Sequence, residues 1–145
     1  PSNSSAASDV YKRQVLVDDS IVRGTTSKQI VKLLKEAGAA EVHLRIASPP
    51  LRFPCFYGID FQTTSELFAA NHSVPEMRDL LDVESLGFLS TQGLEDSVGL
   101  QTTAPNGGLC VAYFTGKYPT ALDDYAPALN KEVASLKVNV AEVSA

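Results

Sequence analysis

Apolar and polar residues alternate along this chain in patterns that divide it into strands and helices. Val15–Val17 is a run of apolar, β-prone residues, and residues 41–48 alternate in polarity as a strand does. Between these segments, apolar residues recur at helical spacing and predict a helix over Thr26–Ala37, with Gly38 after its C-terminus. The apolar face of that helix is expected to comprise Ile30, Leu33, Leu34 and Ala37, with Lys28, Lys32 and Lys35 on the solvated side.

The order of strand, helix and strand determines the predicted fold class. Two strands joined by a helical crossover lie parallel and form a right-handed unit, so we expect an α/β fold. Later in the chain, a serine or threonine placed three residues before a glutamate predicts two capping boxes that begin helices. The elements expected after residue 50 are helices at the Thr63–Glu66 and Ser73–Glu76 capping boxes, a strand over Leu86–Leu89, a helix from Thr91 to Val98 ended by Gly99, and a helix over Ala126–Lys137.

Composition limits the kinds of partner that we expect. The chain has 145 residues and a net charge of −5, which argues against nucleic acid as a partner. It has no apolar run of the length that spans a bilayer, so we expect no membrane partner either. The two cysteines lie far apart and form no disulfide framework, and the first residues lack the order of a signal peptide. These features together favour a cytoplasmic protein.

The stretch from Val15 to Thr26 carries the strongest chemical signal. Two adjacent acids, Asp18 and Asp19, follow the first strand, and a short loop with one glycine precedes the first helix. Ligands bind beyond the carboxyl ends of strands in open α/β sheets, and the N–H groups at a helix N-terminus bind phosphate. Because carboxylates repel phosphate, a ribose phosphate fits both features. Its phosphate would lie in the loop, and the acids would reach the ribose hydroxyls or a Mg²⁺ bound to them.

The string Val-Asp-Asp-Ser-Ile-Val-Arg-Gly-Thr-Thr resembles the phosphoribosyl pyrophosphate (PRPP) motif of type I phosphoribosyltransferases. The resemblance implies a Rossmann-like parallel sheet with flanking helices, of which this chain would be a part, truncated at its N-terminus. It also implies that Asp18 and Asp19 hold Mg²⁺ and the ribose hydroxyls. The residues implied to bind the 5-phosphate are Ser20, Arg23, Gly24, Thr25 and Thr26.

Two later segments resemble the glutamine PRPP amidotransferases, or amidophosphoribosyltransferases, of the Bacillus type. They are residues 48–60, which contain Arg-Phe-Pro-Cys-Phe-Tyr-Gly, and residues 109–120, which contain Thr-Gly-Lys-Tyr-Pro. In that family both segments carry cysteine ligands of an iron–sulfur cluster, and the matching residues here are Cys55 and Cys110. Another ligand position is matched by Gly107, which has no thiolate. We therefore expect no cluster, and interpret both cysteines as leftover buried thiols.

The resemblance implies that ammonia released from glutamine reacts with PRPP to give 5-phosphoribosylamine, the first committed step of de novo purine (IMP) biosynthesis. PRPP and purine nucleotides are the implied ligands, and the full-length enzyme is expected to be a homo-oligomer. The glutaminase half of the family has no counterpart in this sequence. No nucleophile–base pair can be assembled from its residues, so no catalytic residue is assigned and we expect the chain alone to be inactive. The alternatives are another type I phosphoribosyltransferase, or a non-catalytic purine-nucleotide-sensing module on the same fold.

Three regions are expected along the chain. Residues 1–14 are rich in serine and alanine and resemble translated adapter sequence, the alternative being a natural flexible leader. Residues 15–100 would form the C-terminal part of the phosphoribosyltransferase domain. Residues 101–145 would form a C-terminal tail that packs on it.

Overall fold

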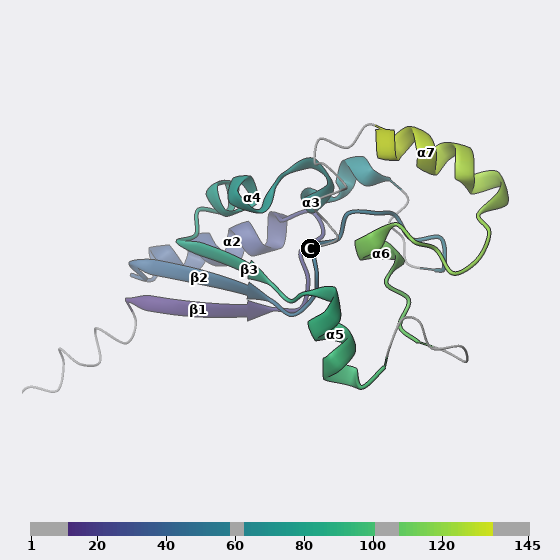
Figure 1. The fold of residues 1–145 in the computed structure, drawn as a ribbon. Helices are drawn as coiled ribbons and strands as arrows, with labels where there is room; N and C mark the ends of the chain where they lie inside the picture. The colour runs from purple at the N-terminus through teal and green to yellow at the C-terminus, as the bar shows by residue number, and fades with distance from the viewer. Residues whose placement is uncertain (1–11, 59–62, 101–107, 135–145) are drawn as a thin grey trace, which may run out of the picture.

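The fold is built on a sheet of three parallel strands in the order β1-β2-β3 (Figure 1). The structure is a computed structural model that describes residues 12–58, 63–100 and 108–134. The predicted leader therefore lies almost wholly outside the described residues, as do Gly107 and the end of the tail. The strands are β1 (Arg13–Asp18), β2 (Glu41–Ile46) and β3 (Ser85–Phe88), so β1 begins two residues before the strand predicted from Val15.

Helical crossovers join the parallel strands, as the sequence predicts for an α/β fold. The first crossover is a single helix, and the second contains three helical segments. Together they cover one face of the sheet. The residues of β2 therefore alternate between buried and more exposed positions along its length. The first crossover is α2 (Thr25–Glu36), and the second contains η1 (Thr64–Glu66), α3 (Phe68–Asn71) and α4 (Val74–Leu81).

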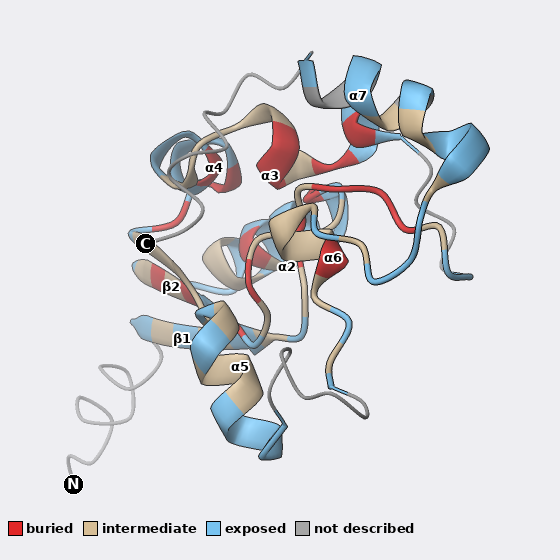
Figure 2. Ribbon diagram, turned by 45° about the vertical axis from the view of Figure 1, so that its right-hand side comes forward, coloured by how far each residue is buried: buried red, intermediate tan, exposed pale blue. Residues whose placement is uncertain are grey.

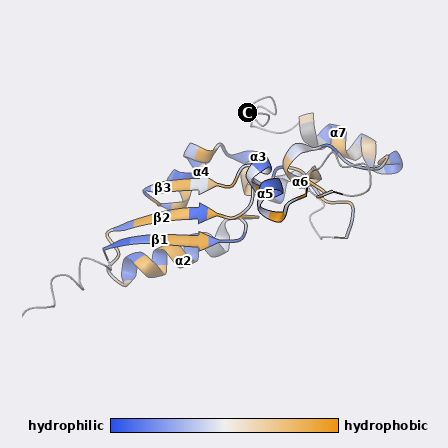
Figure 3. Cartoon of the chain, turned by 60° about the horizontal axis from the view of Figure 1, so that its bottom comes forward, coloured by the Kyte–Doolittle hydropathy of each residue, from blue (hydrophilic) through white to orange (hydrophobic). Residues whose placement is uncertain are grey.

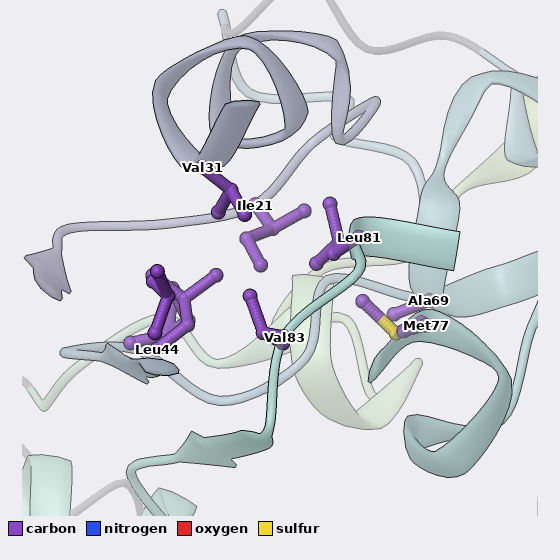
Figure 4. Packing of buried hydrophobic residues seen from close by; sticks show 9 residues of the cluster. Ile21, Val31, Leu44, Ala69, Met77, Leu81 and Val83 are labelled. Atoms are coloured by element: carbon purple, nitrogen blue, oxygen red, sulfur yellow. The ribbon is translucent and has the colours of Figure 1, made fainter. Parts of the chain in front are cut away.

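The hydrophobic core lies between β2 and the two crossover helices α2 and α4. Figure 4 shows Val31 of α2 and Leu81 of α4 pointing toward the same space as Leu44 of β2, with Ile21 among them. All four side chains are at most 1% exposed. Buried residues accordingly gather on β2, α3 and α4 (Figure 2). Ile21 belongs to the loop after β1, so this core anchors that loop directly.

The opposite face of the sheet is more open in the described part of the chain. Val15 and Val17 of β1 are 65% and 68% exposed, and the middle of β1 is visibly apolar in Figure 3. Polar side chains occupy the same face of the neighbouring strands. Nδ1 of His43 lies 2.8 Å from Oγ of Ser85, and a terminal nitrogen of Arg45 donates to that same oxygen. His43 is thus a structural residue of the sheet.

The predicted orientation of α2 is only partly right: Leu34 packs against the core and Lys28 and Lys32 are exposed, as predicted, but the most buried positions differ. Ser27 and Val31 are its buried residues, whereas Leu33 is 64% exposed. The helix packs through positions four residues apart against the buried Leu81 of α4 and the β2 face, so its apolar stripe is only partly covered. Lys35 is also not on a solvated face, because its ammonium group forms ion pairs with Asp82 and Glu84 at 3.0 and 3.5 Å.

Helix caps follow the sequence signals in some places only. Ser73 and Glu76 form the predicted capping box at the start of α4. No side chain caps η1, so the capping box predicted at Thr63 is wrong. The next helix, α5 (Thr91–Val98), has the predicted bounds, is capped by Ser90 and ends at Gly99 as predicted.

The described part of the C-terminal tail packs against the loop that follows β2. The hydroxyl of Tyr118 donates to the carbonyl of Pro54 at 2.7 Å, and the ring of Phe56 lies 5.1 Å from that of Tyr125. The tail contains α6 (Ala112–Thr115), η2 (Asp123–Tyr125) and α7 (Ala126–Ala134), and residues 135–137 of the predicted last helix lie outside the described residues. Across the described ranges, no helix has the length and apolar character needed to cross a membrane.

Candidate functional site

The carboxyl end of β1 presents two neighbouring carboxylates. Asp18 is the last residue of the strand, and its backbone carbonyl accepts a hydrogen bond from the N–H of Ala47, which follows β2. The N–H of Asp19 donates to Oδ1 of Asp18 at 3.0 Å, and the hydroxyl of Ser20 donates to Oδ1 of Asp19 at 3.2 Å. Each carboxylate is therefore held by a local hydrogen bond and keeps further lone pairs for a ligand.

The loop between Ser20 and Thr25 turns sharply into α2. Gly24 is the N-cap residue and has a left-handed backbone, with φ of 75°, which a glycine adopts without steric cost. Its carbonyl accepts the first helical hydrogen bond, from the N–H of Lys28 at 2.9 Å. The N–H groups of Thr25, Thr26 and Ser27 precede this bond, and no side chain caps them. They form a cluster of donors at the positive end of the helix dipole.

These features surround one surface cavity of about 240 Å³. Asp18 at the end of β1, Asp19 and Arg23 of the loop, and the first turn of α2 all line it, so the structure brings the predicted site residues together. The volume is sufficient for a phosphate group with part of its sugar, and the lining offers both N–H donors and carboxylate acceptors. The lining residues are Asp18, Asp19, Ser20, Ile21, Val22, Arg23, Gly24, Thr25, Thr26 and Ser27.

A second segment, far away in sequence, supports this loop from the side. The N–H of Phe68 donates to the carbonyl of Val22 at 2.7 Å, and Oε2 of Glu66 lies 3.1 Å from Nη2 of Arg23. Sequence reasoning missed Glu66 and Phe68 as neighbours of the loop. No local pattern signals these contacts, because more than 40 residues separate their partners along the chain.

Both cysteines are neighbours of Tyr113, in the region where the tail packs. Cys55 is buried, Cys110 is exposed, and both are free thiols. Burial raises the pKa of Tyr113 above its ordinary value, and the neighbouring Cys55 and Cys110 act in the same direction. The interpretation of Cys110 as a buried thiol is therefore wrong, although the fold does bring both cysteines near Tyr113.

Two curated relatives of this chain carry the same name. No protein-family model matches the chain. It is 54% identical over 123 residues to the amidophosphoribosyltransferase of Staphylococcus aureus (strain Mu50), a match that covers 83% of this chain and 25% of the relative. The Bacillus subtilis enzyme of the same name is 56% identical over 111 residues, which are 77% of this chain and 23% of the relative. The chain is homologous to one segment of the amidophosphoribosyltransferases.

Solved structures of amidophosphoribosyltransferases share the fold. The glutamine PRPP amidotransferase of B. subtilis, complexed with ADP and GMP, superposes with a TM-score of 0.70 at 48% identity over 83% of this chain and 29% of that one. A second structure, described as the allosteric regulatory enzyme of purine biosynthesis, gives a TM-score of 0.70 at 49% identity over 87% of this chain and 26% of that one. The chain thus spans about a quarter of the length of the curated relatives it matches.

The donors of this chain do not by themselves fit the iron–sulfur cluster that the sequence resemblance implies. Such a cluster is held by four thiolates, and the chain has two cysteines. One of them, Cys55, is buried and accepts a hydrogen bond from the N–H of Tyr57 at 3.2 Å. Within the described ranges, no group of three or more histidine, cysteine, aspartate or glutamate side chains is placed to hold a metal ion.

Proposed function

We propose that this chain binds the ribose-5-phosphate end of PRPP, and the 5′-phosphate of purine nucleotides, in the cavity between β1 and α2. In a full-length amidophosphoribosyltransferase this site would serve the formation of 5-phosphoribosylamine. The observation that carries the proposal is the uncapped first turn of α2 beside Asp18 and Asp19, in one cavity. The B. subtilis relative is complexed with ADP and GMP, which favours a nucleotide as one ligand of the fold.

The 5-phosphate would bind at the start of α2. The N–H groups of Thr25 and Thr26, together with their hydroxyls, are donors at the positive end of a helix of 12 residues. Arg23 lines the same cavity, and its guanidinium would add a full positive charge. This part of the substrate is remote from the reacting anomeric carbon, so its binding free energy would orient the sugar.

Asp18 and Asp19 would hold Mg²⁺ together with oxygens of the substrate. Mg²⁺ in phosphate-binding enzymes is usually held by one or two carboxylates plus substrate phosphates, so a pair of acids is a fitting donor set. The ion would neutralise charge on the pyrophosphate leaving group. The residues of this chain would bind and orient PRPP, and we assign none of them a proton-transfer or nucleophilic role.

We further propose that residues 15–100 are the C-terminal part of a phosphoribosyltransferase domain and residues 101–145 a tail on it. The contacts of Tyr118 and Tyr125 with the loop after β2 support this division. Cytoplasmic location and a homo-oligomeric full-length enzyme belong to the same proposal. They rest on the homology to biosynthetic enzymes.

Isothermal titration of the purified chain with PRPP, in the presence of Mg²⁺, tests the proposal. We expect saturable binding with one site, and competition by GMP. An assay of pyrophosphate release with PRPP and ammonium should show no turnover by the chain alone. Absence of PRPP binding by a folded sample would contradict the proposed function.

A further inference from the structure

We propose that the segment Thr64–Asn71, which contains η1 and α3, is a brace that holds the phosphate loop in its binding conformation, and that Phe68 is its positioning residue. The phosphate loop here means residues 20–26. The inference rests on the proposed function, since it assigns a role to residues outside the cavity through their contacts with the loop.

The ring of Phe68 lies directly against the α-carbon of Gly24. A β-carbon built on Gly24 would come within 2.9 Å of Cδ1 and 3.0 Å of Cε1 of that ring, closer than side-chain carbons pack. Gly24 is therefore required for two reasons, its left-handed φ of 75° and the absence of a side chain facing Phe68. The orientation of the first N–H groups of α2 depends on this turn.

Two polar contacts tie the brace to the loop on either side of Gly24. The N–H of Phe68 donates to the carbonyl of Val22 at 2.7 Å, which fixes the backbone before the turn. The ion pair between Glu66 and Arg23, at 3.1 Å, fixes a side chain that lines the cavity. The pair engages Nη2 of a guanidinium that carries five N–H donors, so the same side chain has donors for a phosphate oxygen.

The brace is itself rigidly held by the rest of the fold. Leu67, Ala69 and Ala70 are at most 1% exposed. The side-chain amide of Asn71 donates to the carbonyls of Thr64 at 2.9 Å and Leu67 at 2.8 Å, which closes the segment on itself. A loop held against a rigid segment loses less conformational entropy when a ligand binds, and preorganisation of this kind raises the affinity for the ligand.

The test compares single and double substitutions of Gly24 and Phe68. Ribose 5-phosphate is the probe, and its affinity is measured by calorimetry on the full chain. We expect Gly24→Ala to weaken binding at least about tenfold, and Phe68→Ala to weaken it about threefold. In the double variant the clash is gone and only the left-handed φ of residue 24 still opposes an alanine, so its affinity loss should be clearly smaller than the product of the two single losses.

Gly116 and Phe53 form a matched control pair. Gly116 also has a left-handed φ, of 70°, and a β-carbon there would come within 2.9 Å of Cε1 of Phe53. These residues lie away from the cavity lining. Gly116→Ala should lower the thermal midpoint as Gly24→Ala does, and should leave the affinity for ribose 5-phosphate within about twofold of the unsubstituted chain.

Hydrogen exchange without ligand tests the brace independently of the proposed function. We expect Phe68→Ala, or Phe68→Leu if the alanine variant does not fold, to speed exchange of the Lys28 amide, which is bonded to Gly24. Exchange of the Gly116 amide, bonded to Ala112, should stay unchanged. Unchanged exchange at Lys28, or a double variant in which the two affinity losses simply multiply, would overturn the proposal. If the unsubstituted chain fails to bind ribose 5-phosphate, the proposed function fails, and the exchange result alone decides whether the brace exists.

Discussion

The guanidinium of Arg23 and the carboxylate of Glu66 form an ion pair with Nη2 and Oε2 3.1 Å apart, which joins the phosphate loop to the second crossover. Both side chains are about half exposed, at 52% and 45%. Exposed pairs of this kind contribute little to stability. The significance of the pair therefore lies in where it holds the guanidinium, at the edge of the cavity.

Arg23→Gln should weaken the binding of ribose 5-phosphate about tenfold, because a charge-assisted hydrogen bond to phosphate contributes about 1.5 kcal/mol or more. The dependence of affinity on salt concentration should also become shallower, since one cation fewer faces the anion. Calorimetric titrations at low and high salt measure both effects. Arg78, whose ion pair with Asp79 lies on α4, is the matched control, and Arg78→Gln should change neither quantity.

Asp18→Asn and Asp19→Asn should separate the two halves of the site. Without Mg²⁺, each variant should bind ribose 5-phosphate as well as the unsubstituted chain or better, because a charge that repels phosphate is removed. The increase in PRPP affinity on adding Mg²⁺ should be lost in each variant. Titrations with and without Mg²⁺ provide the comparison, with Asp96→Asn on α5 as the control. Retention of the full Mg²⁺ effect in both variants would refute the assignment of the metal ligands.

The observed burial along α2 predicts unequal effects of substituting two nearby apolar residues. Val31 is 1% exposed and Leu33 is 64% exposed. Val31→Ala should lower the free energy of unfolding by about 2 kcal/mol, since two methyl groups leave a packed core. Leu33→Ala should change it by less than about 0.5 kcal/mol, as exposed substitutions usually do. Urea denaturation measures both values. A larger loss of stability for Leu33→Ala than for Val31→Ala would contradict the observed burial and would favour the helix face that the sequence pattern predicts.

Glu84 links stability to acid pH. The backbone N–H of Val42 donates to its carboxylate, and this bond, with the charge of Lys35, holds the pKa of Glu84 below its usual 4.5 although burial acts in the opposite direction. The stabilising contribution is therefore complete above about pH 4.5 and is lost as the pH falls through the lowered pKa. Glu84→Gln keeps an acceptor but removes the charge. It should cost roughly 0.5 kcal/mol at neutral pH, a figure discounted for solvent screening, and nothing in strong acid.

The contrast for Glu84 is the exposed ion pair between Glu36 and Lys32 on α2. Its atoms are 3.7 Å apart, and both side chains are more than half exposed. Glu36→Gln should therefore change the free energy of unfolding very little relative to the unsubstituted chain, at neutral pH and in acid alike. A Glu84→Gln variant that matched the unsubstituted chain at neutral pH would contradict the role given to Glu84.

The sequence predicted what depends on local order along the chain. The strand, the two acids and the glycine-containing turn follow one another directly, so the cavity between Asp18 and Ser27 could be expected from the order of the residues alone. The orientation of α2 could not be predicted in the same way, because Ile30 and Leu33 fit a helical apolar stripe as well as Val31 does. Which side is buried depends on β2 and α4, whose positions are set by the sheet order β1-β2-β3.

Long-range contacts explain the remaining differences. The approach of Phe68 to Gly24 joins residues 44 apart in the chain, and no spacing rule connects them. The threonine at position 26 lies one residue inside α2, because the left-handed turn at Gly24 begins the helix early. A cap that uses a glycine leaves the first N–H groups without a side-chain partner, which is the arrangement that a phosphate ligand requires.

The most direct test of the account is an amide-resolved titration of the chain with PRPP and Mg²⁺ by heteronuclear NMR. We expect saturable shifts of the amide signals of Asp19 to Ser27, with the largest at Thr25 and Thr26. The amides of α7, which lie away from the cavity, should serve as unshifted references. A folded chain whose Thr25 and Thr26 signals do not move at saturating PRPP would contradict the claim that the start of α2 binds the 5-phosphate.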